Sequence, residues 1–216
     1  MKQLTKYTLI LGTTLTILIY IFASSFLAMQ ITNSVRLEIT SFPEEYDLLY
    51  ENVEFVSRGT DIKLKGWYIS SESQTERTII ITHGLNANRS GNLELTKDLI
   101  NLNYNVLLYD IRGHGESEGD RFNGGFIERF DLLGAFDYIE NRPTDPSKIG
   151  ILGFSLGGGI SLMAAGEEKK ISAVVTDSAF ADIENLIVQE TERRTSLPKW
   201  IIPSLIPGMT TATKIF

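Results

Sequence analysis

The chain of 216 residues has no cysteine and only two histidines, His83 and His114. The absence of cysteine excludes disulfide bonds, thiolate metal sites and a cysteine nucleophile. With only two imidazoles in the chain, a histidine-rich metal site is not expected either, and the sequence implies no bound metal. The same scarcity restricts any mechanism that needs a histidine as its base.

Charge is absent from a long N-terminal stretch, because no charged residue stands between Lys6 and Arg36. The apolar run Tyr7–Met29 (residues 7–29) is longer than the about 20 residues with which a helix crosses a bilayer. The lysines before this run place residues 1–6 in the cytoplasm and the remaining chain outside, by the positive-inside rule. We therefore predict a single-pass anchor in the cell membrane, with lipid as the partner of this helix.

Two other interpretations of the apolar run remain open. The small residues Ala23-Ser24-Ser25 would suit the cleavage site of a signal peptide, although the run exceeds the usual h-region of about 7–15 residues. A buried helix of a soluble protein fits less well, since the run lies at the extreme N-terminus and has no polar face.

Acidic residues outnumber basic ones, and the formal net charge of the chain is −7. Residues 1–36 contribute +3, so the remainder carries −10. An acidic domain after the anchor argues against nucleic acid as a partner. The charge says little about the substrate, and the oligomeric state is not indicated.

Strand-like and helix-like patterns alternate across residues 51–216, after a polar stretch of residues 30–50 that we interpret as a linker. Strands are expected at Asn52–Ser57 and Lys63–Ile69, which form a hairpin, and at Thr78–Thr82, Asn105–Tyr109, Ile149–Gly153 and Ala173–Asp177. Helices are expected at Asn92–Asn103, from Phe126 to the breaker Asn141-Arg142-Pro143, and at Ser155–Glu168. Such alternation predicts a mostly parallel sheet between helices, a three-layer α/β sandwich.

The final segment, Leu197–Phe216 (residues 197–216), combines three prolines with apolar residues such as Trp200 and Ile206. Two interpretations remain open for this segment. It could begin a lid over a functional site, or it could be an irregular connecting loop, because long proline-rich loops in compact domains are often but not always functional.

Gly153-Phe154-Ser155-Leu156-Gly157 is a G-x-S-x-G motif between an expected strand and an expected helix. This context is typical of a nucleophile elbow, a strained strand-to-helix turn that exposes a serine hydroxyl. Glycines at 153 and 157 would remove side chains that clash with neighbouring backbone. The helix N-terminus directs N–H groups towards the serine and favours a developing oxyanion. A glycine-rich turn whose serine merely caps the helix is the alternative.

His83-Gly84-Leu85 directly follows the expected strand Thr78–Thr82. A glycine at this position lets the loop approach the elbow, and the amides of Leu85 and Leu156 would then form an oxyanion hole. We interpret His83 as a loop-ordering residue, because it lies at this loop and upstream of the serine.

A third motif, Asp110-Ile111-Arg112-Gly113-His114-Gly115-Glu116-Ser117, closes the expected strand Asn105–Tyr109. Its two glycines allow a tight turn at the carboxyl edge of the sheet, where α/β proteins form ligand sites. Asp110 and Arg112 could pair and fix this loop. We expect His114 to order the loop through a hydrogen bond, with a catalytic role as the alternative.

In order and spacing, the three motifs resemble the α/β-hydrolase superfamily over about Asn52 to Phe180. The match looks closest to its serine aminopeptidase and monoacylglycerol-lipase-like branch, which has membrane-anchored bacterial members. The resemblance implies an α/β-hydrolase sandwich with Ser155 as the catalytic nucleophile and the amides of Leu85 and Leu156 as the oxyanion hole. It also implies that residues 197–216 begin the cap.

The chain departs from the family in its triad, which runs Ser, then Asp or Glu, then His along the sequence. No histidine follows Ser155, and the only later aspartates are Asp177 and Asp182. Asp177 ends the strand directly after the elbow helix, one strand before the family's usual acid, so we interpret it as a loop-ordering residue. A serine hydroxyl without a base is a poor nucleophile.

Three hypotheses follow for function. In the first, the chain is a C-terminally incomplete serine hydrolase that forms an acyl-serine intermediate from an ester, thioester or amide. In the second, it is an inactive, membrane-tethered binding protein. In the third, it is an enzyme that uses His114 or His83 as an unusual base. The substrate would be a small acyl compound or a peptide, because fold-level kinship does not decide between them. No organic cofactor is implied, since acyl transfer needs only side chains and backbone amides.

Overall fold

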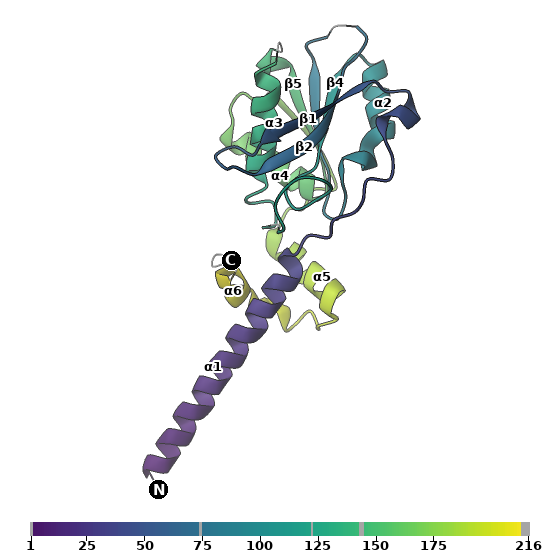
Figure 1. Cartoon of the computed structure of the whole chain (residues 1–216). Helices are drawn as coiled ribbons and strands as arrows, with labels where there is room; N and C mark the ends of the chain where they lie inside the picture. Colours follow the sequence, from purple (N-terminus) through teal and green to yellow (C-terminus); the bar gives the residue numbers. More distant parts are fainter. Residues whose placement is uncertain (1, 74, 122, 143–144, 213–216) are drawn as a thin grey trace. The chain divides into compact units, whose positions relative to one another are not determined.

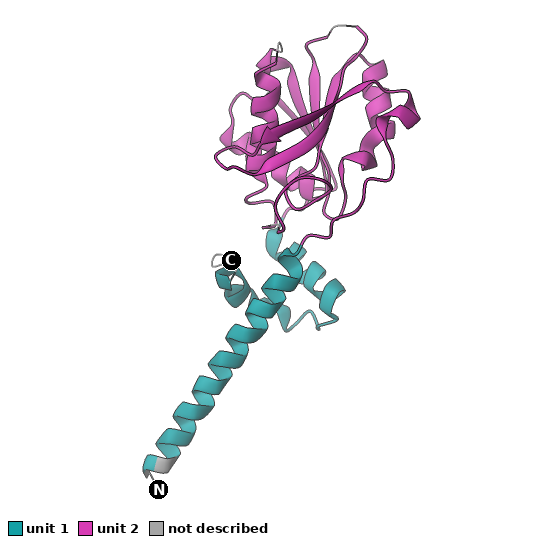
Figure 2. Cartoon of the chain, in the orientation of Figure 1, with its two compact units in different colours: residues 1–33, 182–216 teal, residues 34–181 magenta. Residues whose placement is uncertain are grey.

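A computed structural model describes residues 2–73, 75–121, 123–142 and 145–212 of the chain. The chain forms two compact units (Figure 2). Unit 2 comprises residues 34–181, and unit 1 combines residues 1–33 with residues 182–216. The N-terminal helix therefore belongs with the last helices of the chain and not with the sheet that follows it.

Unit 2 is built on a six-stranded sheet (Figure 1). Its strands are β1 Tyr50–Val56, β2 Lys63–Ile69, β3 Thr78–Thr82, β4 Asn105–Tyr109, β5 Ile149–Phe154 and β6 Ala173–Asp177. They lie in the order β1-β2-β4-β3-β5-β6. β2 pairs antiparallel with β1 and β4, whereas β4, β3, β5 and β6 run parallel. The predicted hairpin and mostly parallel sheet are confirmed.

Helices cover both faces of the sheet (Figure 1). α2 (Leu93–Asn101) packs on one face, and α3 (Arg129–Glu140) and α4 (Leu156–Glu167) pack on the other. Side chains alternate between faces along a strand, so β4 contributes Val106 and Leu108 to the core under α2, and Leu107 and Tyr109 to the core under α3 and α4. This two-sided burial explains the continuous apolar run of β4 and confirms the three-layer architecture.

Short 3-10 helices cover Pro43–Tyr46, Arg89–Asn92 and Pro146–Lys148. The longer α3 begins at Arg129, so the helix start that the sequence predicted at Phe126 is wrong. The buried carboxylate of Glu128 accepts the amides of Asn123 and Gly125, each at 2.8 Å. Satisfying these amides holds residues 123–128 in a turn, and Phe126 is left exposed.

Residues 36–38 of the expected linker belong to unit 2 and are bound to its loops. The Arg36 guanidinium donates to the carbonyl oxygens of Gly115 at 3.0 Å and Ser117 at 2.7 Å, and also to that of Gly119. The side-chain amide of Asn88 donates to the carbonyls of Leu37 and Glu38. Residues 36–38 are therefore fixed to the loops that follow β3 and β4.

The described residues of unit 1 form three helices, α1 (Lys2–Thr32), α5 (Ile183–Thr195) and α6 (Ile202–Ala212). A small apolar core joins α1 to α6 through Leu27, Ala28, Ile31, Met209 and Ala212. Because residues 202–212 are helical through Pro207, the irregular-loop interpretation of Leu197–Phe216 is wrong for this stretch. Pro203 lies in the first turn, where a helix needs no N–H. Residues 213–216 lie outside the described part of the chain.

We expect Gly134→Ala to lower the free energy of unfolding by about 1–3 kcal/mol. A Cβ on Gly134 would overlap the carbonyl oxygen of Val56 and lie 3.1 Å from the amide nitrogen of Arg58. Urea unfolding of the purified chain in detergent would measure the change.

Gly166→Ala is the matched control, since Gly166 is also helical and has no atom within 4 Å of an added Cβ. Helix propensity alone predicts that this control gains up to about 1 kcal/mol. Equal responses of the two variants would contradict the packing of α3 against the hairpin.

Candidate active site

Ser155 stands at the junction of β5 and α4 with φ 50° and ψ −112°. Residues with a Cβ adopt such a conformation only when their surroundings hold them in it. The turn leaves Ser155 exposed while its neighbour Leu156 is buried. The amide of Ser155 donates to the carbonyl of Asp177, the last residue of β6, at 2.8 Å. The strained turn is therefore tied to the adjacent strand.

Glycines on each side of Ser155 allow the turn to lie against the sheet. A Cβ on Gly157 would overlap the carbonyl oxygens of Thr82 and His83 at the end of β3. A Cβ on Gly153 would overlap backbone of Gly157 in the first turn of α4. Any side chain at either position would push the first turn of α4 away from the strands.

The loop after β3 passes close to Ser155. A Cβ on Gly84 would lie 3.3 Å from the Cβ of Ser155 and 4.0 Å from its Oγ. The amide of Leu85 follows this glycine, and the amide of Leu156 follows the serine itself. Within the described residues neither amide N–H donates a hydrogen bond, so both can serve an incoming acceptor.

His83 is buried and uses both ring nitrogens. Its Nδ1 lies 2.8 Å from the carbonyl oxygen of Gly84, and its Nε2 accepts the amide of Ile111 at 3.2 Å. A ring that donates to a carbonyl and accepts from an amide is neutral. Burial lowers the pKa of His83 to about 4, helped by the nearby imidazole of His114. His83 thus joins the loops after β3 and β4 and has no nitrogen left to act as a base.

His114 is bonded in the same way. Its Nδ1 lies 2.9 Å from the carbonyl oxygen of Arg112, and its Nε2 accepts the amide of Asn86 at 3.4 Å. Burial lowers the pKa of His114 as well. The two rings pack with centroids 5.3 Å apart. The geometry argues against either imidazole as the base for Ser155.

Asp110 is paired with Arg89, so the pairing of Asp110 with Arg112 expected from the sequence is wrong. One carboxylate oxygen of Asp110 accepts the amide of Arg89 at 2.7 Å, and the other accepts the Arg89 guanidinium and the amide of Glu116. Both side chains of the pair are buried. Arg89 also lies over the ring of Trp67, 4.5 Å from its centroid. This pair connects the loop after β3 to the loop after β4.

Arg112 is instead bound to Asp131 in α3. The Arg112 Nε lies 3.0 Å from both carboxylate oxygens of Asp131, and the Arg112 amide donates to the same carboxylate at 2.9 Å. Asp131 is fully buried and Arg112 is largely so. A second nitrogen of Arg112 donates to the hydroxyl of Ser57. The sequence analysis missed the ion pairs Arg89–Asp110 and Arg112–Asp131. One partner of each pair, Arg89 or Asp131, stands outside the motifs.

Asp177 contacts the elbow through its backbone carbonyl. Its side chain is exposed and accepts the hydroxyl of the next residue, Ser178, at 2.8 Å. Among the described strands, β6 pairs only with β5, and Val175 of β6 is 63% exposed.

The described residues contain no cluster of three or more His, Cys, Asp or Glu side chains that could hold a metal ion.

Residues 77–200 match the family described as alpha/beta hydrolase fold. The protein YqkD of Bacillus subtilis is 28% identical over 159 residues, which are 73% of this chain and 52% of YqkD. The lysophosphatidylserine lipase ABHD12 of Bos taurus is 31% identical over 148 residues, which are 66% of this chain and 35% of the lipase. The chain spans about half the length of the first of these relatives and about a third of the second.

Among solved structures, the esterase Pf2001 of Pyrococcus furiosus is similar to this chain with a TM-score of 0.69 and 27% sequence identity. The match covers 81% of this chain and 70% of the esterase. The fold described above is therefore that of a solved esterase over most of the chain.

We expect the His83 imidazole to stay neutral until the pH falls to about 4. In the unfolded chain a histidine titrates near pH 6.5. Because the folded pKa is lower, stability is greatest above about pH 6.5 and falls as the pH drops from there towards about 4. With only two histidines in the chain, imidazole ¹⁵N NMR follows both directly, and His114→Gln identifies the signals. A ring that titrates at or above pH 6.5 would contradict the assigned hydrogen bonds.

We expect Arg89→Met to destabilise unit 2 by about 3–5 kcal/mol, because it leaves the buried carboxylate of Asp110 without its cation. The double variant Arg89→Met/Asp110→Asn removes the charge and should recover part of this loss. Urea unfolding of both variants measures the difference. If the double variant is no more stable than the single one, the uncompensated charge is not the cause.

Proposed function

This chain belongs to the alpha/beta hydrolase family, and from that premise we propose that it is a serine hydrolase whose nucleophile is Ser155. The observation that carries the proposal is the backbone of Ser155, held at φ 50° in a strand-to-helix turn. Strain of this kind persists where the surrounding structure imposes it, and it gathers at functional sites. Here it accompanies an exposed serine beside the glycine loop.

The proposed reaction is acyl transfer to the serine. The Oγ of Ser155 attacks the carbonyl carbon of an ester, thioester or amide while a base accepts its proton. The carbonyl oxygen becomes an oxyanion that accepts hydrogen bonds from the amides of Leu85 and Leu156. The tetrahedral intermediate then expels an alcohol, thiol or amine, which takes up a proton and leaves an acyl-serine. Water attacks the acyl-serine in the same manner and releases the acid.

The supporting loops keep these donors in place. His83 and the Arg89–Asp110 pair join the loops after β3 and β4, and Asp177 holds the amide of Ser155. We assign Arg112 and His114 the same ordering role, because each binds backbone or a buried carboxylate. Fixed donors stabilise the oxyanion without reorganising during the reaction.

We place the base outside the 216 residues. His83 and His114 are the only histidines here, and backbone groups occupy the ring nitrogens of both. The half of YqkD that this chain does not span leaves room for a base and the acid that orients it. An Asp followed by a His is the order expected of this family.

For the substrate we propose a small ester, with a thioester, amide or peptide bond as a further possibility. The similar structure from Pyrococcus furiosus is named an esterase, and the Bos taurus relative is named a lysophosphatidylserine lipase. An ester leaving group departs more readily than an amine, so a serine hydrolase of either type also cleaves simple esters.

Helix α1 could anchor the enzyme to a membrane. Its stretch Thr5–Thr32 is long and apolar enough to cross a bilayer, with a mean hydropathy of 2.0. Large side chains such as Leu9 and Phe22 are more than 70% exposed, and lipid would cover them. We propose a single-pass anchor in the cell membrane with a cytoplasmic N-terminus, because Lys2 and Lys6 precede the span.

A second candidate function is binding without catalysis. The engagement of both histidines favours it, because the chain as given then has a nucleophile but no base. In that case the loops beside Ser155 would hold an acyl compound without forming an acyl-serine.

We expect the product of the native gene to react at Ser155 with a fluorophosphonate probe and Ser155→Ala to abolish this labelling. We expect the 216-residue chain alone to react slower by about four to six orders of magnitude, the range seen when the triad acid or the triad base is lost. Mass spectrometry of the labelled peptide identifies the site. Reading the native gene past the codon for Phe216 shows whether an Asp and a His follow.

The outcomes separate the hypotheses. Labelling of the 216-residue chain at the full rate would mean that the base is His83 or His114. No labelling of the native product, with retained binding of an acyl ligand, would favour the binding protein.

A further inference from the structure

The C-terminal helix α6 contacts α1 well inside the uncharged run of α1. The hydroxyl of Tyr20 donates to the carbonyl oxygen of Ser204 at 3.1 Å. Gly208 faces the same part of α1, because an added Cβ there would overlap the side chain of Ser24 and lie 3.0 Å from the ring of Tyr20. The close approach thus depends on a glycine against a serine, as in helix packing within membranes.

These contacts set the depth of α6 if α1 spans a bilayer. The hydrocarbon core takes about 20 helical residues, and the uncharged run is Tyr7–Met29. Any window of that length within the run includes residues 10–26. Tyr20 and Ser24 therefore lie in the hydrocarbon at every register, and a helix that touches both lies at the same depth.

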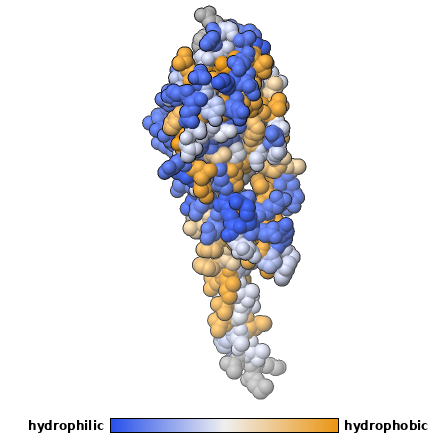
Figure 3. Space-filling view, turned by 90° about the vertical axis from the view of Figure 1, so that its right-hand side faces the viewer, coloured by the Kyte–Doolittle hydropathy of each residue, from blue (hydrophilic) through white to orange (hydrophobic). Residues whose placement is uncertain are grey.

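The composition of α6 fits that depth. No charged residue occurs from Trp200 to Thr213, and the exposed residues of α6 are all uncharged: Pro203, Ser204, Pro207, Thr210 and Thr211. The helix α5 differs, since it exposes charged side chains such as Glu184 and Arg193. Figure 3 shows hydrophobic residues along α1 and hydrophilic ones over much of unit 2.

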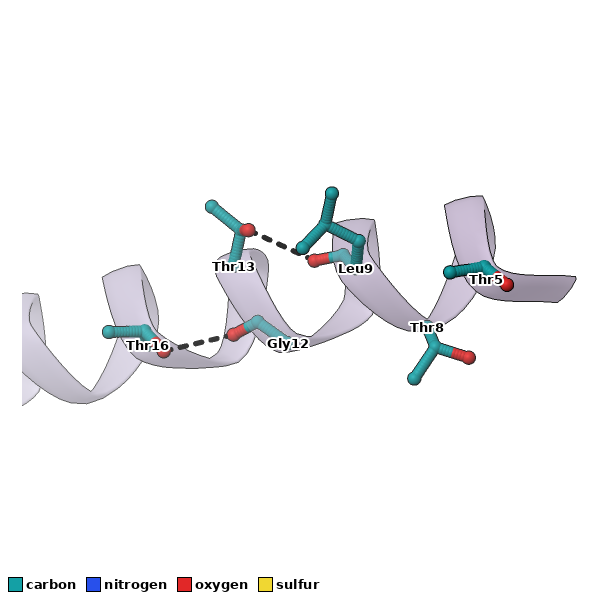
Figure 4. Close-up of a pocket in the computed structure, with 6 residues that line it drawn as sticks. All are labelled: Thr5, Thr8, Leu9, Gly12, Thr13 and Thr16. Atoms are coloured by element: carbon teal, nitrogen blue, oxygen red, sulfur yellow. Dashed lines mark hydrogen bonds between the residues drawn. The ribbon is translucent and has the colours of Figure 1, made fainter. Parts of the chain in front are cut away.

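The exposed hydroxyls of α6 are satisfied by their own helix. Ser204 donates to the carbonyl of Ile201 at 2.6 Å, Thr210 to that of Ile206 at 3.0 Å, and Thr211 to that of Pro207 at 2.8 Å. Figure 4 shows the same arrangement on α1, where Thr13 and Thr16 donate to carbonyls one turn earlier. In lipid a hydroxyl has no water to bond, so such self-satisfied hydroxyls suit a lipid-facing surface.

The polar boundary lies further along α1. Arg194 of α5 donates to the carbonyls of Gln30 and Asn33 at 2.9 and 3.2 Å. Helix-end carbonyls lack partners within the helix, and a guanidinium suits the headgroup level. α5 therefore belongs to the interface, whereas α6 lies deeper.

We propose that residues 200–212 insert into the outer leaflet of the bilayer that α1 spans, as a short helix that does not cross it. The occupant of the exposed face of α6 is phospholipid acyl chain, which also covers Trp200, a residue that is 80% exposed and precedes the end of α6 that contacts Tyr20. The inference rests on the proposed membrane anchor and is independent of the chemistry at Ser155.

The absence of native cysteine allows a test with single-cysteine variants. Thr211→Cys probes α6, Arg193→Cys probes the exposed face of α5, and Leu11→Cys probes α1. Each full chain is inserted into phosphatidylcholine vesicles and treated with a charged, membrane-impermeant maleimide, before and after solubilisation in mild detergent. Labelling at Ser155, measured separately in each variant of the native product, reports whether the hydrolase is intact.

We expect Thr211→Cys and Leu11→Cys to resist the maleimide in vesicles, with Thr211→Cys becoming reactive in detergent. We expect Arg193→Cys to react in both. Reaction of Thr211→Cys in vesicles while Leu11→Cys resists would overturn the insertion of α6 and leave the anchor intact. Protection of Thr211→Cys in detergent as well would mean that protein covers α6, which also overturns the proposal. Reaction of Leu11→Cys in sealed vesicles would remove the anchor on which it rests.

A second measurement uses tryptophan fluorescence. The chain has two tryptophans, of which Trp67 is buried in unit 2. With Trp67→Phe, emission from Trp200 should be quenched by phospholipids that carry bromine on the acyl chain. With Trp200→Phe, emission from Trp67 should not change. Absence of quenching for Trp200 would contradict the insertion of residues 200–212 into the bilayer.

Discussion

The first turn of α4 presses its backbone against the end of β3, where Gly157 faces the carbonyl oxygens of Thr82 and His83. This approach brings the loop after β3 within reach of Ser155, and it leaves no space for a side chain at 157. The hydrogen bond from the Ser155 amide to Asp177 closes the turn on its other side. The strained conformation of Ser155 is therefore a consequence of two strands and a helix that meet at one point.

Buried ionic and imidazole groups then fix the loops around that point. The carboxylates of Asp110 and Asp131 are each bound by a guanidinium and a backbone amide, and His83 and His114 are neutral bridges between loops. Buried pairs of this kind contribute little net stability compared with apolar packing, but they impose one geometry on segments that have no regular structure. The loops after β3 and β4 can therefore hold the amides of Leu85 and Leu156 in position with few apolar contacts of their own.

The sequence predicted the strands and helices that have a clear local pattern of apolar residues. It did not predict contacts between residues far apart in the chain. Strands β3, β4 and β6 were predicted at their observed bounds, because each is a short run rich in β-branched or apolar residues between breakers. The roles of Arg89 and Asp131 were missed, because the sequence does not show which charged residues the fold brings together as a buried ion pair. The helix α6 was missed because prolines such as Pro203 and Pro207 are typical of loops. The helix is stabilised by tertiary packing against α1, which the local sequence does not reveal.

The order of strands has a consequence for synthesis on the ribosome. Once β4 has paired with β2 and β3, each later strand joins the same side of the sheet, β5 beside β3 and β6 beside β5. No strand has to be inserted between two that are already paired. A nascent chain can thus extend its sheet in the order in which residues emerge. Such vectorial growth exposes one edge at a time, which limits the interval during which an unpaired strand can aggregate.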